Sequence, residues 1–228
     1  MTRAKEAAGI AAAALIEPNT IVGLGSGTTA ACFIEALGLR IQNGLILKAV
    51  VATSKQSADL ARRYKMPLED LNHVEKITVT VDGADEIDSQ KRMIKGGGGA
   101  HVRERIVASS SEELIILVDE SKIVPVLGKG KVPVEILPFG SMHTKRKLEE
   151  LGYFGKWRSR GDHAHTPFLT DNGNFLFDLY FTSPPLQPEK DHEKIKSIAG
   201  IVDTGIFLNM AGRVLVGHED GTATYFNT

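Results

Sequence analysis

The stretch Thr20-Ile21-Val22-Gly23-Leu24-Gly25-Ser26-Gly27-Thr28-Thr29 decides the fold, because it predicts a strand, a glycine turn and a helix in direct succession. The same alternation continues to about residue 125 and is typical of an α/β domain with a parallel sheet. The predicted strands are 20–23, 47–51, 77–81 and 113–118, and the predicted helices are 4–15, 28–37, 54–64 and 100–109.

From residue 128 onward the predicted order changes to β-α-β-β-α-β, with elements at 132–136, 141–151, 153–158, 174–181, 189–198 and 201–207. This order is typical of a split βαβ unit of the ferredoxin-like kind. We therefore expect an α/β fold: a doubly wound, mostly parallel sheet with a second, smaller ferredoxin-like α+β domain. The expected domains are 1–127 (α/β), 128–205 (ferredoxin-like) and 206–228 (C-terminal strands returning to the first domain).

The overall charge gives no sign of a polyanionic partner. The 228 residues carry 27 Lys and Arg against 28 Asp and Glu, for a net charge of −1. A balanced chain has no broad basic field, so nucleic acid and anionic membranes are disfavoured as partners. The alanine-rich apolar run 9–16 is too short to span a bilayer and lacks a secretory cleavage pattern. We expect a cytoplasmic protein.

The first glycine turn predicts an anion site, because backbone N–H groups and a helix N-terminus converge there. Ser26, Thr28 and Thr29 add hydroxyl groups suited to phosphate oxygens, and Gly27 leaves room for close approach. A dinucleotide fingerprint is disfavoured because Thr28 replaces its third glycine, and a Walker loop is disfavoured because no Gly-Lys-Ser/Thr follows. A tight turn that binds nothing stays an open alternative.

The second cluster follows the strand at 77–81 and predicts proton-transfer chemistry. Asp82-Gly83-Ala84-Asp85 comes first, then Lys95-Gly96-Gly97-Gly98-Gly99, and Glu104 lies in the next predicted helix. A carboxylate base beside a cation and a close-approaching glycine loop is what proton abstraction next to a developing oxyanion needs. The alternatives are ordinary ones: carboxylates that cap turns, a solvated lysine and a surface glutamate.

Seven motifs in order give the chain a close resemblance, over nearly its whole length, to ribose-5-phosphate isomerase of the type A family. They are residues 23–30, 52–57, 82–87 and 95–98, Arg103-Glu104, residues 119–122 and residues 131–135. The resemblance implies interconversion of D-ribose 5-phosphate and D-ribulose 5-phosphate in the non-oxidative pentose phosphate pathway. It implies a small-molecule sugar phosphate as substrate, neither cofactor nor metal, and a homodimer or homotetramer.

The resemblance also implies residue roles. Glu104 would be the base that moves a proton between C2 and C1 through an enediolate, with Asp82, Asp85 and Lys95 around the reacting oxygens. Residues 26–29 would line the phosphate end of the pocket and Lys122 would complete it. The substrate-binding set is therefore Ser26, Gly27, Thr28, Thr29, Asp82, Gly83, Ala84, Asp85, Lys95, Gly96, Gly97, Gly98 and Lys122.

Other interpretations of the chain are weaker. A sugar-phosphate sensor would keep the first glycine turn but lack the proton-transfer set, and a deaminating or acyl-transferring relative is a further class. The pair His163 and His165 has no third ligand at convincing spacing, so we expect no metal site. His101 departs from the alanine-leucine-rich link that the family usually has at this place, and we assign it no role.

Overall fold

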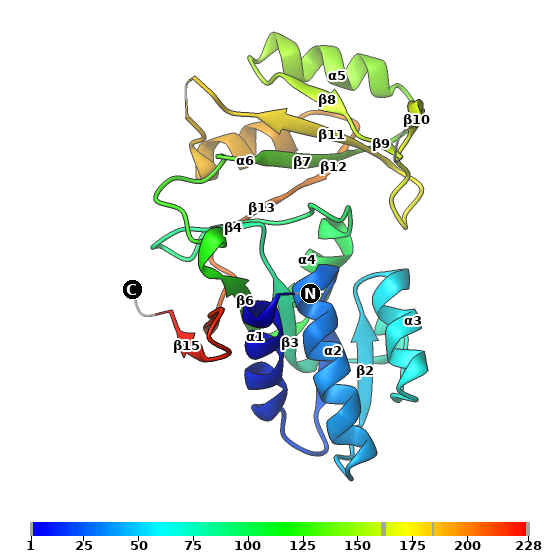
Figure 1. Ribbon diagram of the computed structural model, residues 1–228. Coiled ribbons are helices and arrows are strands. Elements are labelled where there is room, and N and C mark those ends of the chain that lie inside the picture. Colours follow the sequence, from blue (N-terminus) through cyan, green and yellow to red (C-terminus); the bar gives the residue numbers. More distant parts are fainter. Residues whose placement is uncertain (1, 161–162, 184, 227–228) are drawn as a thin grey trace. The chain divides into compact units, whose positions relative to one another are not determined.

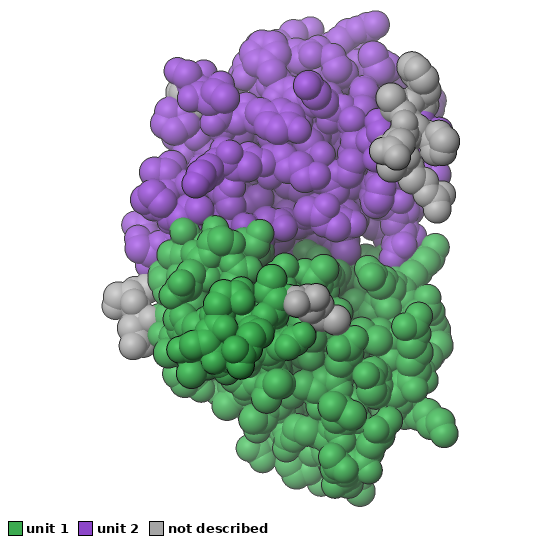
Figure 2. Space-filling model, viewed as in Figure 1, with its two compact units in different colours: residues 1–84, 103–123, 209–228 green, residues 85–102, 124–208 purple. Residues whose placement is uncertain are grey.

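The computed structural model describes residues 2–160, 163–183 and 185–226 (Figure 1). The chain forms two compact units (Figure 2): unit 1 is Met1–Ala84, Arg103–Ile123 and Asn209–Thr228, and unit 2 is Asp85–Val102 and Val124–Leu208. This division differs from the predicted boundaries at 127/128 and 205/206, because Asp85–Val102 contacts the residues of unit 2. None of the helices in the described part of the chain has the length and hydropathy to cross a bilayer.

Unit 1 is built on six strands, β1 (Ile21–Leu24), β2 (Ala49–Ala52), β3 (Ile77–Gly83), β6 (Ser111–Asp119), β14 (Val214–Gly217) and β15 (Ala223–Tyr225). They form one sheet in the order β15-β14-β6-β3-β1-β2 (Figure 1). Every neighbouring pair is parallel except β14 with β15 at the edge. The expected mostly parallel sheet is confirmed, and both C-terminal strands belong to it.

The helices of this part of the chain are α1 (Arg3–Ala14), α2 (Gly27–Gln42), α3 (Lys55–Arg63) and α4 (His101–Ser109). Neighbouring residues of β2 show that both faces of the sheet are covered, because successive side chains of a strand point to opposite faces. Val50 packs with Ala12 and Phe33 of α1 and α2, whereas Val51 packs with Val107 of α4. The sheet is therefore doubly wound.

The centre of the sheet contains a topological switch point. Strand β1 pairs with β2 on one side and with β3 on the other, and β3 pairs onward with β6. The chain thus leaves β1 in one direction and β3 in the opposite direction. In open α/β sheets, ligands bind at the carboxyl ends of strands at such a point. The glycine turn 25–27 follows β1 here, and Asp82-Gly83 forms the end of β3.

Unit 2 contains the predicted β-α-β-β-α-β order as β7 (Lys131–Ile136), α5 (Ser141–Glu150), β8 (Gly155–Trp157), β11 (Phe175–Tyr180), α6 (Pro188–Lys196) and β12 (Ile201–Thr204). The sheet order is β12-β7-β11-β8 and all pairs are antiparallel. Its core alternates along the strands, with Val132, Val134 and Ile136 buried against Phe177 and Leu179. The expected ferredoxin-like domain is confirmed.

A short three-stranded sheet completes unit 2 and corrects one prediction. It pairs β4 (Glu86–Ile87), β5 (Met93–Ile94) and β13 (Ile206–Phe207), and a separate hairpin pairs β9 (Ser159–Arg160) with β10 (His163–Pro167). The predicted single strand 201–207 is wrong: it divides at Gly205 into β12 and β13. Gly205 donates to Pro133 O and accepts from Lys95 N–H, at 2.7 and 2.8 Å, and a Cβ there would lie 2.2 Å from Lys95 O.

Candidate active site

Asp82 organises the first glycine turn. It lies at the end of β3, is almost fully buried, and its Oδ1 accepts from the N–H groups of Ser26 (3.0 Å) and Gly83 (2.7 Å). Gly25 is required here, because a Cβ on it would lie 2.2 Å from the same oxygen. The structure therefore brings Asp82, Gly83 and Ser26 together at the carboxyl edge of the unit 1 sheet, where the switch point lies.

Hydroxyl groups from the end of β2 and the start of α3 hold the turn in place. Ser26 Oγ lies 2.7 Å from Thr53 Oγ1, which also donates to Leu24 O at 3.0 Å. Ser57 Oγ donates to Gly25 O at 2.5 Å, and Ser54 caps α3 through the N–H of Ser57. Because these bonds fix both the strand end and the turn, the N-terminus of α2 has a defined position, which suits the anion site that the sequence predicts there.

The remaining residues of the predicted phosphate loop open α2. Gly27 has φ +87°, a conformation that L side chains rarely adopt, and Thr29 lies beside Gly83, where an added Cβ would be 3.7 Å from Thr29 Cβ. Lys5 Nζ of α1 donates to Thr28 Oγ1 at 3.1 Å. Sequence reasoning missed Lys5, because a lone lysine in an N-terminal helix gives no signal. It adds a cation to the loop predicted to bind phosphate.

Lys122 belongs to a different segment from the glycine turn 25–27. It ends the 3₁₀ turn Glu120–Lys122, which follows β6 and is capped by Asp119 through the N–H of Ser121 at 3.0 Å. Among the described residues, no hydrogen bond or ion pair joins Lys122 to the glycine turn. The turn follows β6, which neighbours β3, so Lys122 is at the same carboxyl edge of the sheet.

Glu104 lies in the first turn of α4 and is buried. Val107 and Ala108, one turn further along the helix, are buried as well. The face of α4 that carries Glu104 is therefore turned inward. A carboxylate held away from bulk water can act as a base without first losing its hydration shell.

Lys95 and the glycine run belong to unit 2. Lys95 is buried, and its backbone bond to Gly205 ties the end of β5 to β13. Its Nζ lies 5.5 Å from the centroid of the Phe207 ring, within range of a cation–π contact. Gly96 and Gly99 have φ of +97° and +86°, and Gly99 N–H closes the loop onto Gly96 O at 2.9 Å.

Asp85 is bound to this loop. Its Oδ2 accepts from Gly97 N–H at 2.7 Å, and its own N–H donates to Ile94 O at 2.8 Å. A Cβ on Gly97 would come within 2.5 Å of Asp85 Oδ1, whereas a Cβ on Gly98 would meet nothing within 4 Å. Gly97 thus allows the carboxylate to approach the backbone, and Gly98 leaves one side of the loop open.

The predicted site residues therefore form two groups. Ser26–Thr29, Asp82, Gly83, Glu104 and Lys122 belong to unit 1, and Asp85 and Lys95–Gly98 belong to unit 2. Ala84 is the last residue of unit 1 before the chain passes to Asp85, and the chain returns at Val102–Arg103, one residue before Glu104. Sequence reasoning missed Arg158, which donates to the carbonyl oxygens of the unit 2 glycine run.

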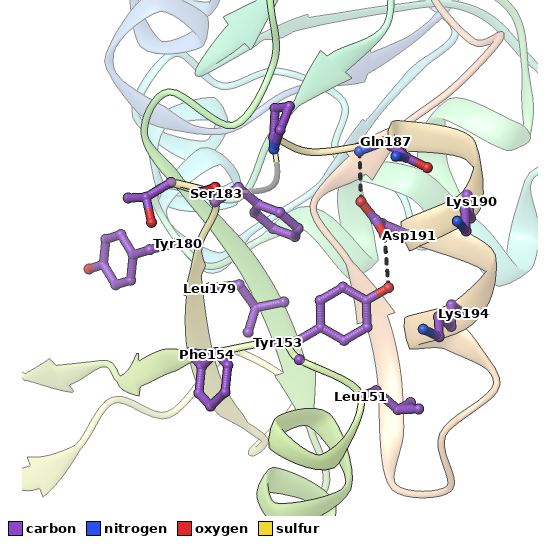
Figure 3. Close-up of a pocket in the computed structure, with 14 residues that line it drawn as sticks. Leu151, Tyr153, Phe154, Leu179, Tyr180, Ser183, Gln187, Lys190, Asp191 and Lys194 are labelled. Carbon is purple, nitrogen blue, oxygen red and sulfur yellow. Dashed lines mark hydrogen bonds between the residues drawn. The ribbon is translucent and has the colours of Figure 1, made fainter.

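No group of three His, Cys, Asp or Glu side chains suited to a metal occurs in the part of the chain that the structure describes. The side chains of His163 and His165 lie outside that part. Figure 3 shows a cavity of about 370 Å³ in unit 2 that contains none of the predicted site residues. There, the carboxylate of Asp191 accepts hydrogen bonds from Tyr153 OH (2.8 Å) and Gln187 N–H (2.7 Å). These bonds give the carboxylate a structural role within unit 2.

One known protein family matches most of this chain. The profile of the family described as Ribose 5-phosphate isomerase A (phosphoriboisomerase A) matches residues 49–221. This chain belongs to that family. A ribose-5-phosphate isomerase A of Protochlamydia amoebophila (strain UWE25) is 45% identical over 219 residues, which are 96% of this chain and 93% of the relative. The resemblance stated from the motifs is confirmed.

Solved structures support family membership at the level of the fold. Ribose 5-phosphate isomerase from Plasmodium falciparum superposes with a TM-score of 0.93, at 36% identity, over 100% of this chain and 99% of that chain. A D-ribose-5-phosphate isomerase in complex with phospho-erythronic acid superposes with a TM-score of 0.91, at 34% identity, over 98% and 97% of the two chains. The type A isomerase fold is thus present from end to end.

Proposed function

We propose that this chain is a ribose-5-phosphate isomerase, an aldose-ketose isomerase of the non-oxidative pentose phosphate pathway. It interconverts D-ribose 5-phosphate and D-ribulose 5-phosphate through an enediolate. Family membership over the whole chain supports the substrate class and the reaction.

The observation that carries the proposal is the burial of the charged groups. Asp82, Lys95 and Glu104 are exposed to only 1%, 3% and 5%. Such side chains are almost never so deeply buried without a strong reason, because removing a charge from water costs several kcal/mol. All three fall in the motifs that carry the family resemblance, whereas the equally buried Asp88 and Glu135 lie outside the predicted site residues and are bound by Arg92 and by Thr170 and Asn174.

The chemistry assigned to Glu104 is a proton transfer. Its carboxylate takes the proton from C2 of the open-chain aldose, and the C–H electron pair forms the C1–C2 double bond as the C1 carbonyl becomes an enediolate oxygen. The protonated Glu104 then delivers a proton to C1 while the C2 oxygen becomes the new carbonyl and a proton passes from O2 to O1. Carbon oxidation levels exchange within one molecule, so the reaction is balanced without an added oxidant or reductant.

The proposal assigns the two reacting oxygens of the sugar, O1 and O2, to Lys95, Asp82 and Asp85. The Lys95 ammonium stabilises negative charge as it develops on the enediolate, which is the interaction that lowers a barrier rather than merely binding substrate. Asp82 and Asp85 move protons between O1 and O2 and assist opening of the furanose ring. Both are anchored by backbone N–H groups, which keep their carboxylates in fixed positions.

The phosphate is assigned to the glycine turn of unit 1. The N-terminus of α2, the hydroxyls of Ser26, Thr28 and Thr29, and the nearby Lys5 provide N–H, O–H and cationic donors. Lys122 completes this end of the pocket. A phosphate held here contributes equally to ground and transition states, and it orients C1 and C2 for the base.

The finer predictions of location and assembly also belong to this proposal. We propose a cytoplasmic enzyme that acts on a small-molecule sugar phosphate as a homodimer or homotetramer. Sedimentation velocity of the purified protein measures the assembly directly, and a monomer at micromolar concentration would contradict that part.

The experiment that tests the function is turnover of ribose 5-phosphate by the purified protein, with chelator present and no nucleotide added. Ribulose 5-phosphate should accumulate to an equilibrium mixture, and the reverse reaction should reach the same mixture. Binding of the sugar phosphate without turnover would instead identify a sensor. Release of ammonia or of an acyl group from another substrate would identify the deaminating or acyl-transferring class.

A further inference from the structure

Arg158 is a nearly buried arginine that sequence reasoning passed over. It lies between β8 and β9, and its side chain is only 10% exposed. Its backbone is fixed on both sides, because its N–H donates to Leu176 O and its carbonyl accepts from Phe168 N–H, both at 2.9 Å. Its guanidinium also lies over the Phe168 ring, 5.8 Å from the centroid. The side chain is therefore held in one direction.

Two nitrogens of the Arg158 guanidinium bind the carboxylate of Asp178. Nε donates to Asp178 Oδ2 at 2.9 Å, and Nη2 donates to Asp178 Oδ1. This bidentate pairing matches the planar fork of arginine to the carboxylate. Lys131 Nζ also lies 3.3 Å from Asp178 Oδ2, so the aspartate has a second cation. The pair orients the remaining nitrogen, Nη1.

Nη1 donates to two carbonyls of the glycine run. It lies 3.1 Å from Gly96 O and 3.0 Å from Gly97 O. The Gly96–Gly97 peptide is thus bound at both ends, because Gly97 N–H donates to Asp85 Oδ2 at 2.7 Å. A continuous chain of contacts runs from Asp178 through Arg158 and one peptide group to Asp85. Every member belongs to unit 2.

The physical effect of this chain of contacts is to fix and polarise one peptide group. A run of four glycines has the largest backbone entropy to lose, so the loop cannot hold a single shape by itself. A buried cation at the carbonyl oxygen fixes the peptide plane. It also draws electron density from the N–H, which strengthens the bond to Asp85 in a hydrogen-bond chain of low local dielectric.

We propose that Arg158 is a positioning residue for the isomerase reaction: it holds the Gly96–Gly97 peptide and, through that peptide, the carboxylate of Asp85. Its catalytic consequence depends on the proposed function, whereas its effect on the loop does not. The alternative is an ion pair with Asp178 that only stabilises the small domain. The two interpretations differ in what happens to residues 96–99 when Arg158 is replaced.

The test combines a structural and a kinetic measurement on Arg158→Gln, with Arg146→Gln as the matched control. Arg146 is an exposed arginine on α5 of the same unit, so the control removes the same charge. Amide hydrogen exchange at residues 97–99 should become at least about 10-fold faster in Arg158→Gln, because the loop opens locally more often. It should remain unchanged in Arg146→Gln.

The kinetic measurement should show kcat lowered by about 10- to 100-fold, with KM changed less than about 3-fold, because Asp85 is misplaced while phosphate binding is intact. Guanidinium ion added to Arg158→Ala should restore part of kcat, and methylammonium should restore less. A purely structural ion pair would lower thermal stability without this kcat-specific loss or rescue.

Unchanged exchange at residues 97–99 in folded Arg158→Gln would overturn the proposal, and so would a normal kcat. If Arg158→Gln does not fold, Arg158→Lys tests the proposal instead. Lysine keeps the charge but cannot bind Asp178 and both carbonyl oxygens together. Arg158→Lys should fold and show the same faster exchange. A wild type without isomerase activity would refute the proposed function, and the exchange measurement would still decide the role of Arg158.

Discussion

The two glycine-rich segments of this chain are held in different ways. The turn 25–27 is supported by its own strand, its own helix and Asp82 of the adjacent strand. The run 96–99 lies between the two-residue strand β5 and the start of α4, and its peptide groups are bound by Asp85 on one side and by Arg158 on the other. Side chains distant in sequence bind both segments, but the turn follows a strand inside the six-stranded sheet, whereas the run follows a two-residue strand and is bound by a nearly buried arginine.

This difference suggests that the two glycine segments have different functions. The turn 25–27, placed at the carboxyl edge of the large sheet, suits a ligand group that must only be held, such as a phosphate. The run 96–99 adjoins Lys95 and Asp85, which the proposed function assigns to the reacting oxygens, so an error in its position would act on the chemical step. Substitutions in the run should therefore act mainly on kcat, and those in the turn on KM, except where a turn residue contacts Asp82.

The largest effect on this comparison should come from Lys95→Ala. We expect kcat to fall by about 10²- to 10³-fold, as when one donor to a developing oxyanion is removed. Lys129→Ala, an exposed lysine of the same unit, is the control. Thermal stability should change little, since the buried ammonium carries a desolvation cost. If Lys95→Ala does not fold, the role of Lys95 is structural and the prediction is wrong.

The next effect compares glycines directly. Gly25→Ala would place a Cβ 2.2 Å from Asp82 Oδ1 and 2.6 Å from Asp82 Cα. Gly97→Ala would place a Cβ 2.5 Å from Asp85 Oδ1. We expect kcat/KM to fall by about 10²-fold in both, more in Gly25→Ala, because there the backbone itself must move. Gly98→Ala, which meets nothing within 4 Å, should stay near wild type. Equal losses in all three variants would argue against close approach as the reason for the glycines.

The smallest effect should come from the phosphate loop. Thr29→Val keeps the shape but removes one hydroxyl, so KM should rise by about 10-fold while kcat stays within about 2-fold. Thr20→Val, whose hydroxyl bonds Glu17 O outside the loop, is the control. Steady-state kinetics with ribose 5-phosphate measure both. A lower kcat with KM unchanged would mean that the phosphate binds elsewhere.

Sequence predicted the parts of the molecule whose signals are local. Strand β3, the turn after β1 and the ferredoxin-like order all follow from periodicity and turn residues within a few positions. Glu104 was selected as the candidate base because its motif adjoins a glycine run, and the structure buries it. The two-residue strands β4 and β5 are too short to show any alternation.

The features that sequence missed depend on contacts between distant segments. Arg158 lies 62 positions from Gly96, and nothing around it distinguishes it from a surface arginine. Gly205 breaks a predicted strand because the backbone of Lys95 passes 2.2 Å from where its Cβ would be, a restraint visible only in three dimensions. Lys5 beside Thr28 is a third case.

The central claim is that one buried glutamate moves the proton, and Glu104→Gln in deuterated water tests it most directly. Glutamine keeps the shape but cannot accept the proton, so turnover should fall by about 10²- to 10⁴-fold. Wild type should introduce deuterium at the carbon that receives the proton, to the extent that the protonated base exchanges with solvent. The variant should still bind ribose 5-phosphate yet show neither turnover nor label. Near-normal turnover by a correctly folded Glu104→Gln protein would contradict the account and make Asp82 or Asp85 the next candidate for the base.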